Sequence, residues 1–469
     1  MLFNSFEFFI FFPIVTLVYF FLPHTYRWIW LLSASCLFYM FFIPSYILIL
    51  LLTILIDYFA GIRIAQVQGN AKKRWLWFSV ISTCLILGVF KYCNFFIENW
   101  NGLANLLGWN YSLSALQMIL PIGLSFHTFQ SMSYVIEVYR GNQQPERHFG
   151  IYSLYVMFYP QLVAGPIERP QNILHQFYQK QAYNYANVSA GLQRMLWGMV
   201  KKVVIADNLA PVVKAVYASS DIAGWHWLLL ATVFFSIQIY CDFSGYSDIA
   251  IGAARVMGFR LMENFNLPYL SRNVREFWSK WHISLSSWFR DYVYIPLGGN
   301  RKGVVRTGAN FLIVFALSGF WHGANWTFVV WGLIHGLLVV SSNFFSWHTE
   351  RNWINVAKIF FTFSLVSVAW IFFRAENLTQ ALSFIEGIFT WRHQEVFLPN
   401  VFASIIGMPL IGKASLVVAF ILLDKRITAI ILQQKFISRG KRTVLLSLLL
   451  MSLVIFGYWG EVDFIYFQF

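Results

Sequence analysis

Long apolar runs restrict what this chain can fold into more than any other feature of its sequence. They occupy residues 6–22, 75–97, 227–240, 354–373 and 443–459, and a less apolar tail continues the third run. A helix needs about 20 mostly apolar residues to cross roughly 30 Å of hydrocarbon. A transmembrane β-barrel would instead show alternating segments of about ten residues. The runs therefore predict an all-α, polytopic membrane protein.

The composition agrees with that fold class. Only 12% of the 469 residues are charged and 58% are hydrophobic, whereas a soluble domain has about 25% charged residues. The first run carries Glu7 where a cleavable signal would be basic, so we interpret it as the first span. We expect about eleven transmembrane helices in a single domain, residues 1–469, embedded in the lipid bilayer.

Basic residues indicate the topology. Lys and Arg cluster at 63–74 and at 425–442, which includes Lys435, and such clusters favour the cytoplasmic side. The stretch 92–139 holds no Lys or Arg, and the chain ends with Glu461 and Asp463, so both are expected outside. This rule explains most of the net charge of +14, and no nucleic-acid partner is expected. A basic cytoplasmic face would also attract an anionic donor such as a phosphorylated cofactor.

Residues 260–306 interrupt the regular pattern. Eight Lys or Arg and three acidic residues lie here among nine Trp, Phe and Tyr. The segment is too polar to span the bilayer and too aromatic for a solvated loop. It predicts an amphipathic or re-entrant element at the cytoplasmic surface. An interfacial belt of aromatic residues is the alternative interpretation.

Four of the ten histidines lie within apolar or aromatic sequence: His127, His282, His322 and His335. Ionisable residues inside a membrane are costly, so each is a candidate for function. His335 follows His322 by thirteen residues, which is about 20 Å along a continuous helix and roughly 220° around it. The two cannot share a site unless the helix breaks. We therefore interpret His335 and His127 as structural.

His322 is the candidate general base. A near-neutral pKa makes histidine the usual group for removing a hydroxyl proton, and Gly319 and Gly323 would let a substrate or another backbone approach closely. A core histidine bonded to a neighbouring helix is the alternative. His282 follows Trp281 in the basic aromatic segment, and a re-entrant fold could bring it beside His322. Its alternative is an interfacial histidine that only positions the segment.

Two carboxylates interrupt the apolar run near residue 240. Asp242 and Asp248 enclose a polar stretch that contains Tyr246. Six positions separate the two aspartates, so they do not lie on one helical face. A locally unwound helix lining a polar cavity would accommodate both. The alternative is that they pair with Arg255 or Arg290 in a structural role.

Other chemistries have weaker support. The four cysteines form no CxxC pair and no HExxH motif occurs, so neither a disulfide nor a metal site is expected. A GxSx pattern at 123–126 is too short to indicate a serine protease. A transporter built on broken helices is the main rival class. It predicts an internal repeat, and we see none in the sequence.

Two long motifs resemble a known family. The segments WHISLSSWFRDYVYIPLGGNR and FWHGANWTFVVWGLIHG are similar to the signature of the membrane-bound O-acyltransferase family. The likeness is strongest to the bacterial branch of alginate O-acetyltransferase membrane subunits and teichoic acid D-alanyl transfer proteins. Nearly the whole chain takes part, through LPIGLSFHTFQSMSYVIEVYRG, PQLVAGPIERP, YCDFSGYSDIAIGAARVMGFRLMENFN and DFIYFQF.

The resemblance implies both a site and a setting. His322 matches the family's catalytic histidine, and His282 matches its second functional position. A ring of helices around a thin central funnel is implied, with donor access from the cytoplasm, in the inner (cytoplasmic) membrane. It also implies a periplasmic partner acyltransferase of the SGNH type, which finishes the transfer onto a polysaccharide.

We therefore expect an enzyme that moves an acetyl group from a cytoplasmic thioester toward an exopolysaccharide such as alginate. Acetyl-CoA is the expected donor, and no cofactor is expected to stay bound. His322 would take the hydroxyl proton, and His282 would orient the acyl group or stabilise the oxyanion. D-alanyl transfer, peptidoglycan O-acyl transfer and a non-catalytic transport or export subunit are the alternatives. The expected substrate-binding residues are Trp281, Arg290, Asp291, Asn300, Trp321, Asp242 and Tyr246.

Overall fold

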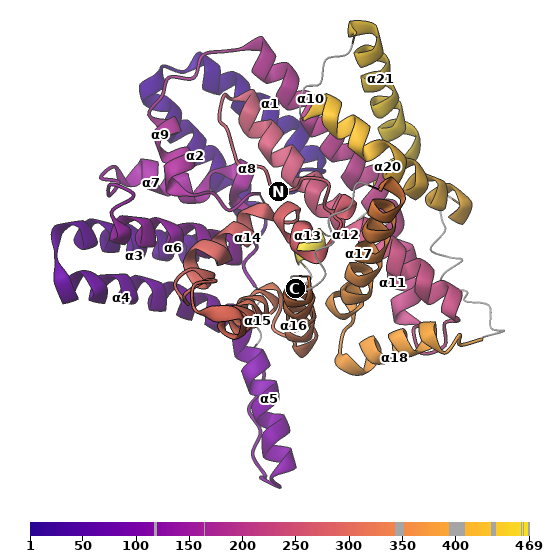
Figure 1. Cartoon of the computed structure of the whole chain (residues 1–469). Coiled ribbons are helices and arrows are strands. Elements are labelled where there is room, and N and C mark those ends of the chain that lie inside the picture. Colours follow the sequence, from indigo (N-terminus) through magenta and orange to yellow (C-terminus); the bar gives the residue numbers. More distant parts are fainter. Residues whose placement is uncertain are drawn as a thin grey trace. The chain divides into compact units, whose positions relative to one another are not determined.

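A computed structural model describes residues 1–116, 120–163, 165–342, 351–393, 409–432, 438–460, 462 and 464–467. Over these residues the regular elements are helices, and no strand occurs (Figure 1). The all-α fold class is therefore confirmed. The topological expectations for Lys435, Glu461 and Asp463 fall outside the described residues.

Five helical segments are long and apolar enough to cross a membrane, judged by length and composition. Since several such segments occur in one chain, the polytopic class is confirmed. The number of spans, about eleven, stays a prediction, because shorter apolar helices such as α1 (Phe6–Phe21) are not counted among the five. The five segments are Pro44–Gln66, Gly69–Leu106, Trp225–Val256, Gly303–His322 and Asn352–Arg374.

The described chain divides into two compact units, and the prediction of a single domain stays untested. The first unit comprises residues 1–188 and 253–262, and the second comprises 189–252 and 263–469. Helices of the first unit are α1, α2 (His24–Met40), η1 (Pro44–Tyr46), α3 (Ile47–Gln66), α4 (Gly69–Leu87), η2 (Gly88–Tyr92), α5 (Cys93–Leu106), α6 (Leu124–Arg140), α7 (Phe149–Met157), α8 (Tyr159–Leu162) and α9 (Pro170–Phe177).

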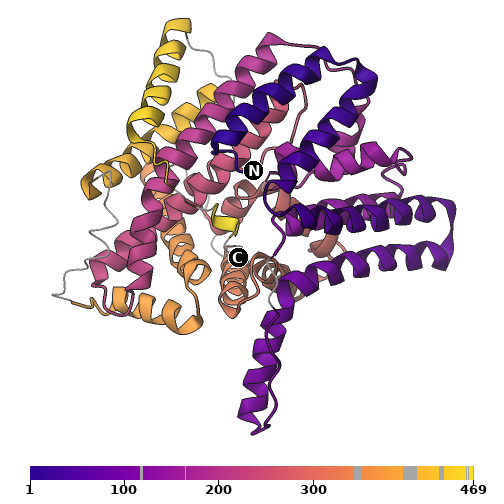
Figure 2. The same cartoon turned by 180° about the vertical axis from the view of Figure 1, so that it is seen from behind.

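A buried polar cluster ties three helices of the first unit together. The carboxylate of Asp57 on α3 accepts hydrogen bonds from Ser79 and Thr83 on α4, and from Ser131 on α6. Figure 2 and Figure 1 both show these helices side by side, while α5 projects away from them. A buried carboxylate is costly unless donors satisfy it, so the three hydroxyls explain how this packing is tolerated.

The second unit carries the candidate site. Its helices are α10 (Tyr185–Met199), η3 (Val200–Ala206), α11 (Asp207–Ala218), α12 (Trp225–Val256), η4 (Pro268–Leu270), α13 (Val274–Lys280), α14 (Ile283–Phe289), η5 (Arg290–Tyr294), α15 (Gly303–His322), α16 (Trp326–Ser341), α17 (Asn352–Arg374), α18 (Leu378–Phe389), α20 (Leu410–Ile431), α21 (Arg439–Phe456) and η6 (Ile465–Phe467). The first four residues of α10 and the last four residues of α12 belong to the first unit.

The basic aromatic segment, predicted to be too polar to span the bilayer, forms short helices. Helices α13 and α14 have seven residues each and η5 has five. Seven residues of helix extend only about 10 Å, so none of these elements can cross a bilayer. Between α13 and α14 the backbone of His282 adopts a left-handed conformation, with φ of 44°. The turn places the His282 side chain at the start of α14.

A sharp break separates α15 from α16. Gly323 ends α15 in an extended conformation, and the side chain of Asn325 caps α16 by accepting a hydrogen bond from the Thr327 amide at 3.0 Å. The two helices then pack closely, because a Cβ added to Gly319 would lie 2.1 Å from the carbonyl oxygen of Phe328. His322 is therefore the last residue of its helix. The helix breaks between His322 and His335, which is what the two histidines would need in order to lie near each other.

Helix α12 is continuous from Trp225 to Val256, so the local unwinding considered around Asp242 and Asp248 is wrong. The two carboxylates instead meet different cations along an intact helix. Asp242 lies 2.9 Å from the ammonium of Lys202, and Asp248 lies 2.5 Å from that of Lys201. Consecutive lysines on η3 therefore pair with both aspartates. The structural alternative named Arg255 or Arg290 as partners, whereas Arg290 pairs with Asp291.

Candidate active site

The His322 imidazole has a defined tautomer. Its Nδ1 atom lies 2.6 Å from the carbonyl oxygen of Ser318, one turn earlier on α15. A carbonyl oxygen can only accept a hydrogen bond, so Nδ1 carries the proton and donates it. In the neutral ring the lone pair is then on Nε2, which is the atom that can act as a base.

Aromatic rings enclose His322, which is only 3% exposed. The ring centroids of Trp321 and Trp331 each lie 4.9 Å from that of His322, and those of Phe373 and Tyr466 lie 5.6 Å and 5.9 Å away. Such surroundings exclude water from the imidazole. They make a dry, low-dielectric setting, in which electrostatic interactions are stronger than in water.

His282 lies close to the same rings. Its ring centroid is 6.4 Å from that of Trp321 and 6.4 Å from that of Tyr466. Burial, with a smaller effect of the nearby His322, lowers the pKa of His282 well below its usual value. The His282 imidazole is therefore neutral at physiological pH. The structure brings the two expected catalytic histidines to one aromatic residue, Tyr466.

The carboxyl-terminal segment is held in this position from α12. The backbone amide of Ile465 donates to the Asp242 carboxylate at 2.8 Å, and the Tyr246 ring lies 4.7 Å from that of Phe464. Both Asp242 and Tyr246 were expected to bind substrate. In the structure they support the segment that carries Tyr466.

The structural interpretation of the other two histidines is consistent with their contacts. His335 is fully buried, and its Nδ1 atom accepts a hydrogen bond of 3.1 Å from the indole of Trp278. His127 belongs to the first unit, where its Nε2 atom lies 3.0 Å from the hydroxyl of Thr53. Each ring has a local partner on a neighbouring helix.

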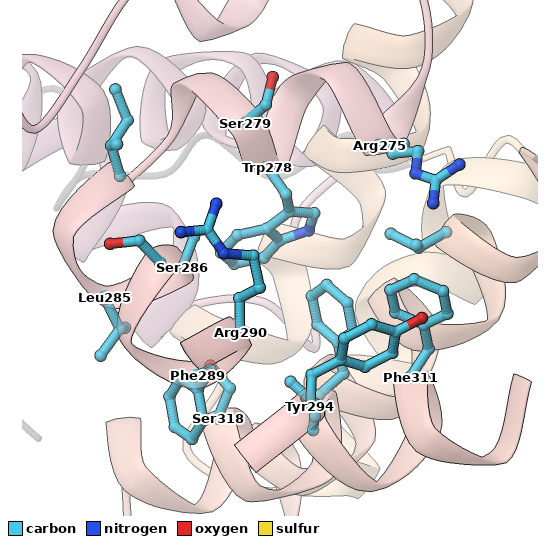
Figure 3. A pocket seen from close by; sticks show the side chains of 15 residues that line it. Arg275, Trp278, Ser279, Leu285, Ser286, Phe289, Arg290, Tyr294, Phe311 and Ser318 are labelled. Atoms are coloured by element: carbon cyan, nitrogen blue, oxygen red, sulfur yellow. The ribbon is translucent and has the colours of Figure 1, made fainter. Parts of the chain in front are cut away.

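A cavity of about 360 Å³ begins one helical turn from His322 (Figure 3). Ser318 lines it, and the carbonyl of Ser318 is the group that holds His322. Two cationic side chains, Arg275 and Arg290, line it together with aromatic residues that include Trp278. The cavity combines a mainly apolar wall with positive charge, which suits a ligand with an apolar or amide arm and an anionic end.

The remaining expected substrate-binding residues are scattered. Trp321 lies near both histidines, and Arg290 lines the cavity. Asp291 pairs with Arg290 at 2.8 Å on the surface, whereas Asn300 is exposed in the turn before α15. Trp281 is fully buried against other aromatic rings and lines none of the described cavities.

Four residues of the site were not singled out from the sequence: Arg275, Ser318, Tyr466 and Asn264, whose side-chain oxygen lies 3.1 Å from Nδ1 of His282. Ser318 holds His322 through its backbone carbonyl, so the residue type at position 318 gives no signal for this bond. The other three reach the site through turns and long-range packing. No local sequence pattern indicates that these residues come together. Among the described residues, no three His, Cys, Asp or Glu side chains gather where they could hold a metal ion.

Comparison with known proteins agrees with the resemblance seen in the motifs. The model of the membrane-bound O-acyltransferase family matches residues 148–385, which include both histidines of the site. A probable alginate O-acetylase AlgI of Azotobacter vinelandii is 39% identical over 386 residues, covering 82% of this chain and 77% of that protein.

Two further relatives show the same level of similarity. A probable alginate O-acetylase AlgI of Pseudomonas aeruginosa is 38% identical over 418 residues, covering 88% of this chain and 79% of that protein. A peptidoglycan O-acetyltransferase of Helicobacter pylori is 38% identical over 390 residues, covering 77% and 73%. With its apolar helices and this similarity, the chain belongs to the membrane-bound O-acyltransferase family and is a multi-pass membrane O-acyltransferase.

Proposed function

We propose that this enzyme transfers an acetyl group from a cytoplasmic thioester to a hydroxyl group, as a step that carries the acetyl group toward an extracytoplasmic polysaccharide. In this proposal His322 is the general base. The observation that carries the proposal is the hydrogen bond from His322 Nδ1 to the Ser318 carbonyl. It leaves the basic lone pair on Nε2, in surroundings that exclude water.

The chemistry balances with one histidine acting first as base and then as acid. Nε2 of His322 takes the proton of the accepting hydroxyl while the oxygen attacks the thioester carbonyl carbon. The carbon–sulfur bond then breaks, and the proton passes to the departing sulfur. An ester and a thiol result. General base catalysis of this kind contributes about 10²–10⁴-fold to the rate.

Acetyl-CoA is the donor that the cavity supports best. Phosphate groups pair favourably with guanidinium groups, and Arg275 and Arg290 both line the cavity. The mainly apolar remainder of the wall would receive the uncharged arm that carries the thioester. Ser318, which lines the cavity, lies about 6 Å along the helix axis from His322, so a donor arm that extends past Ser318 would approach the histidine.

A polysaccharide acceptor is supported by relatives that act on alginate and peptidoglycan. We further propose that the protein lies in the inner membrane and passes the acetyl group to a periplasmic acyltransferase of the SGNH type. The motif resemblance supports this partner. An alginate-like exopolysaccharide is the acceptor class most consistent with the similarity.

The test is a single-turnover assay with purified protein in lipid nanodiscs. Radiolabelled acetyl-CoA is added with or without an oligosaccharide acceptor and a candidate partner acyltransferase. We expect release of the thiol and label on the acceptor or the partner. An acetylated carrier protein, supplied in parallel, should be the poorer donor. Equal use of a carrier protein, or no thiol release from acetyl-CoA, would contradict the proposed donor.

A further inference from the structure

Asn264, which lies between α12 and α13, makes a dense set of contacts with the start of α14. Its side-chain oxygen lies 3.1 Å from Nδ1 of His282 and 2.9 Å from the hydroxyl of Ser284. The asparagine is fully buried, as are His282 and Ser284. A buried amide in such a position can fix how the histidine ring beside it is protonated.

The backbone N–H of Ser284 determines the orientation of the Asn264 amide. The backbone N–H of Ser284 lies 3.3 Å from the end of the Asn264 side chain that faces His282, and a backbone N–H can only donate. The atom at this end must therefore be the oxygen, Oδ1. The other end of the amide, Nδ2, donates to the hydroxyl of Ser247 at 3.1 Å. Both ends of the amide thus agree on one orientation.

The amide orientation then sets the histidine tautomer. Since Oδ1 of Asn264 accepts, Nδ1 of His282 must carry the proton and donate it. The lone pair of the neutral ring is consequently on Nε2, as it is in His322. A neutral His282 in this tautomer has no Nε2 proton to give to an oxyanion.

We infer that Asn264 is a positioning residue that fixes His282 as a neutral hydrogen-bond acceptor at Nε2. The inference rests on the proposed function and refines the role of one of its residues. His282 and His322 both lie against Tyr466, so two acceptors of the same tautomer serve one site. His322 takes the hydroxyl proton and returns it to the departing sulfur, while Nε2 of His282 accepts a hydrogen bond from a donor in the same site. Neither ring gains or loses a proton over the cycle.

The same asparagine also has a structural role, which the test must separate. Its backbone carbonyl accepts the amide of Ile283 at 2.9 Å, and its side chain caps the first turn of α14 through Ser284. Loss of the cap would lower activity by loosening α14. Replacing Asn264 with aspartate keeps an acceptor for both the cap and His282, and adds a negative charge beside the ring.

The experiment measures acetyl transfer against pH for Asn264→Asp, Asn264→Leu and the wild-type protein in nanodiscs. A carboxylate next to a histidine raises its pKa, commonly by 1–3 units. We therefore expect the acid limb of kcat/KM for Asn264→Asp to move to higher pH by at least one unit, with activity near wild type at pH 9. Asn264→Leu should lose activity at least tenfold at every pH.

A matched control is Asn273→Asp, the same change at the side-chain cap of α13, which is exposed. It should leave the acid limb in place. An unmoved acid limb in Asn264→Asp, or an Asp variant as inactive as the Leu variant at pH 9, would overturn the inference. If Asn264→Asp does not fold, Ser247→Ala decides instead: a fall in kcat at unchanged KM supports the inference, and an unchanged kcat overturns it.

Normal activity of a His322→Gln variant would overturn the proposed function separately.

Discussion

His322 and Ser318 are joined by a hydrogen bond of 2.6 Å from the imidazole Nδ1 to the backbone carbonyl oxygen. The bond spans the last turn of α15, which ends at His322. It fixes the tautomer without using a second side chain. The bond leaves Nε2 of His322 available as a base at the end of an apolar helix. The same serine, Ser318, also lines the cavity.

The two arginines of the cavity should govern donor binding rather than the chemical step. Arg275→Gln or Arg290→Gln should raise KM for acetyl-CoA about fivefold, since an exposed ionic contact contributes up to about 1 kcal/mol. The change should leave kcat within twofold and weaken as salt is added. Steady-state kinetics at two salt concentrations measure this. Arg301→Gln, an exposed arginine that does not line the cavity, is the control.

Close packing of α15 on α16 should make Gly319 intolerant of any side chain. A Cβ at this position would lie 2.1 Å from the Phe328 carbonyl oxygen, and such overpacking costs about 1–3 kcal/mol. Gly319→Ala should therefore lower the Tm in detergent. Gly308→Ala on the same helix should not, because its Cβ would meet Val340 at an ordinary 3.8 Å. Equal Tm values for both variants would contradict this account of the hairpin.

Asp242 should act through the carboxyl-terminal segment. Asp242→Ala leaves Lys202 short of one carboxylate and removes the acceptor for the Ile465 amide. Breaking a buried pair commonly costs about 3–5 kcal/mol, so expression and Tm should fall together with activity. Asp242→Asn keeps an oxygen for Ile465 and should retain more kcat than the Ala variant at matched protein level. Indistinguishable kcat values would show that the tether does not matter for Tyr466.

Glu168 should make the folded protein less stable as the pH rises. It lies in the loop before α9, fully buried, and burial raises its pKa from 4.5 to about 7. The folded protein therefore binds a proton more tightly than the unfolded chain, and this stabilisation is lost as pH rises from about 5 through 7. Thermal unfolding across that range should show the Tm falling, and Glu168→Gln should flatten the slope. The exposed Glu98→Gln should leave the slope as it is in the wild type.

The sequence predicted the helical membrane fold because apolar length is a local property. It also indicated the short helices of residues 260–306, since their charge and aromatic content excluded a span. The sequence did not predict the helix break after His322, which was considered only as the condition for His322 and His335 to share a site. Glycine and asparagine near a helix end do not by themselves identify a turn. The structure shows it at Gly323 and Asn325.

Residues that act through distant partners could not be assigned from the sequence. The polar stretch around Asp242 suggested an unwound helix, whereas Lys202 neutralises the carboxylate within an intact one. Asn264 lies 18 positions before His282, and only the fold brings its amide to the ring. In both cases the decisive contact has no period or spacing that could be recognised in the sequence.

The central claim is that Nε2 of His322 removes the hydroxyl proton during acetyl transfer, and single-turnover transfer from acetyl-CoA by a His322→Gln variant tests it most directly. At matched expression and unchanged Tm, the rate should fall by about 10²–10⁴-fold. His335→Gln, which changes the buried histidine bonded to Trp278, serves as the control and should retain most of the rate. Wild-type transfer by His322→Gln, in a folded protein, would contradict the account.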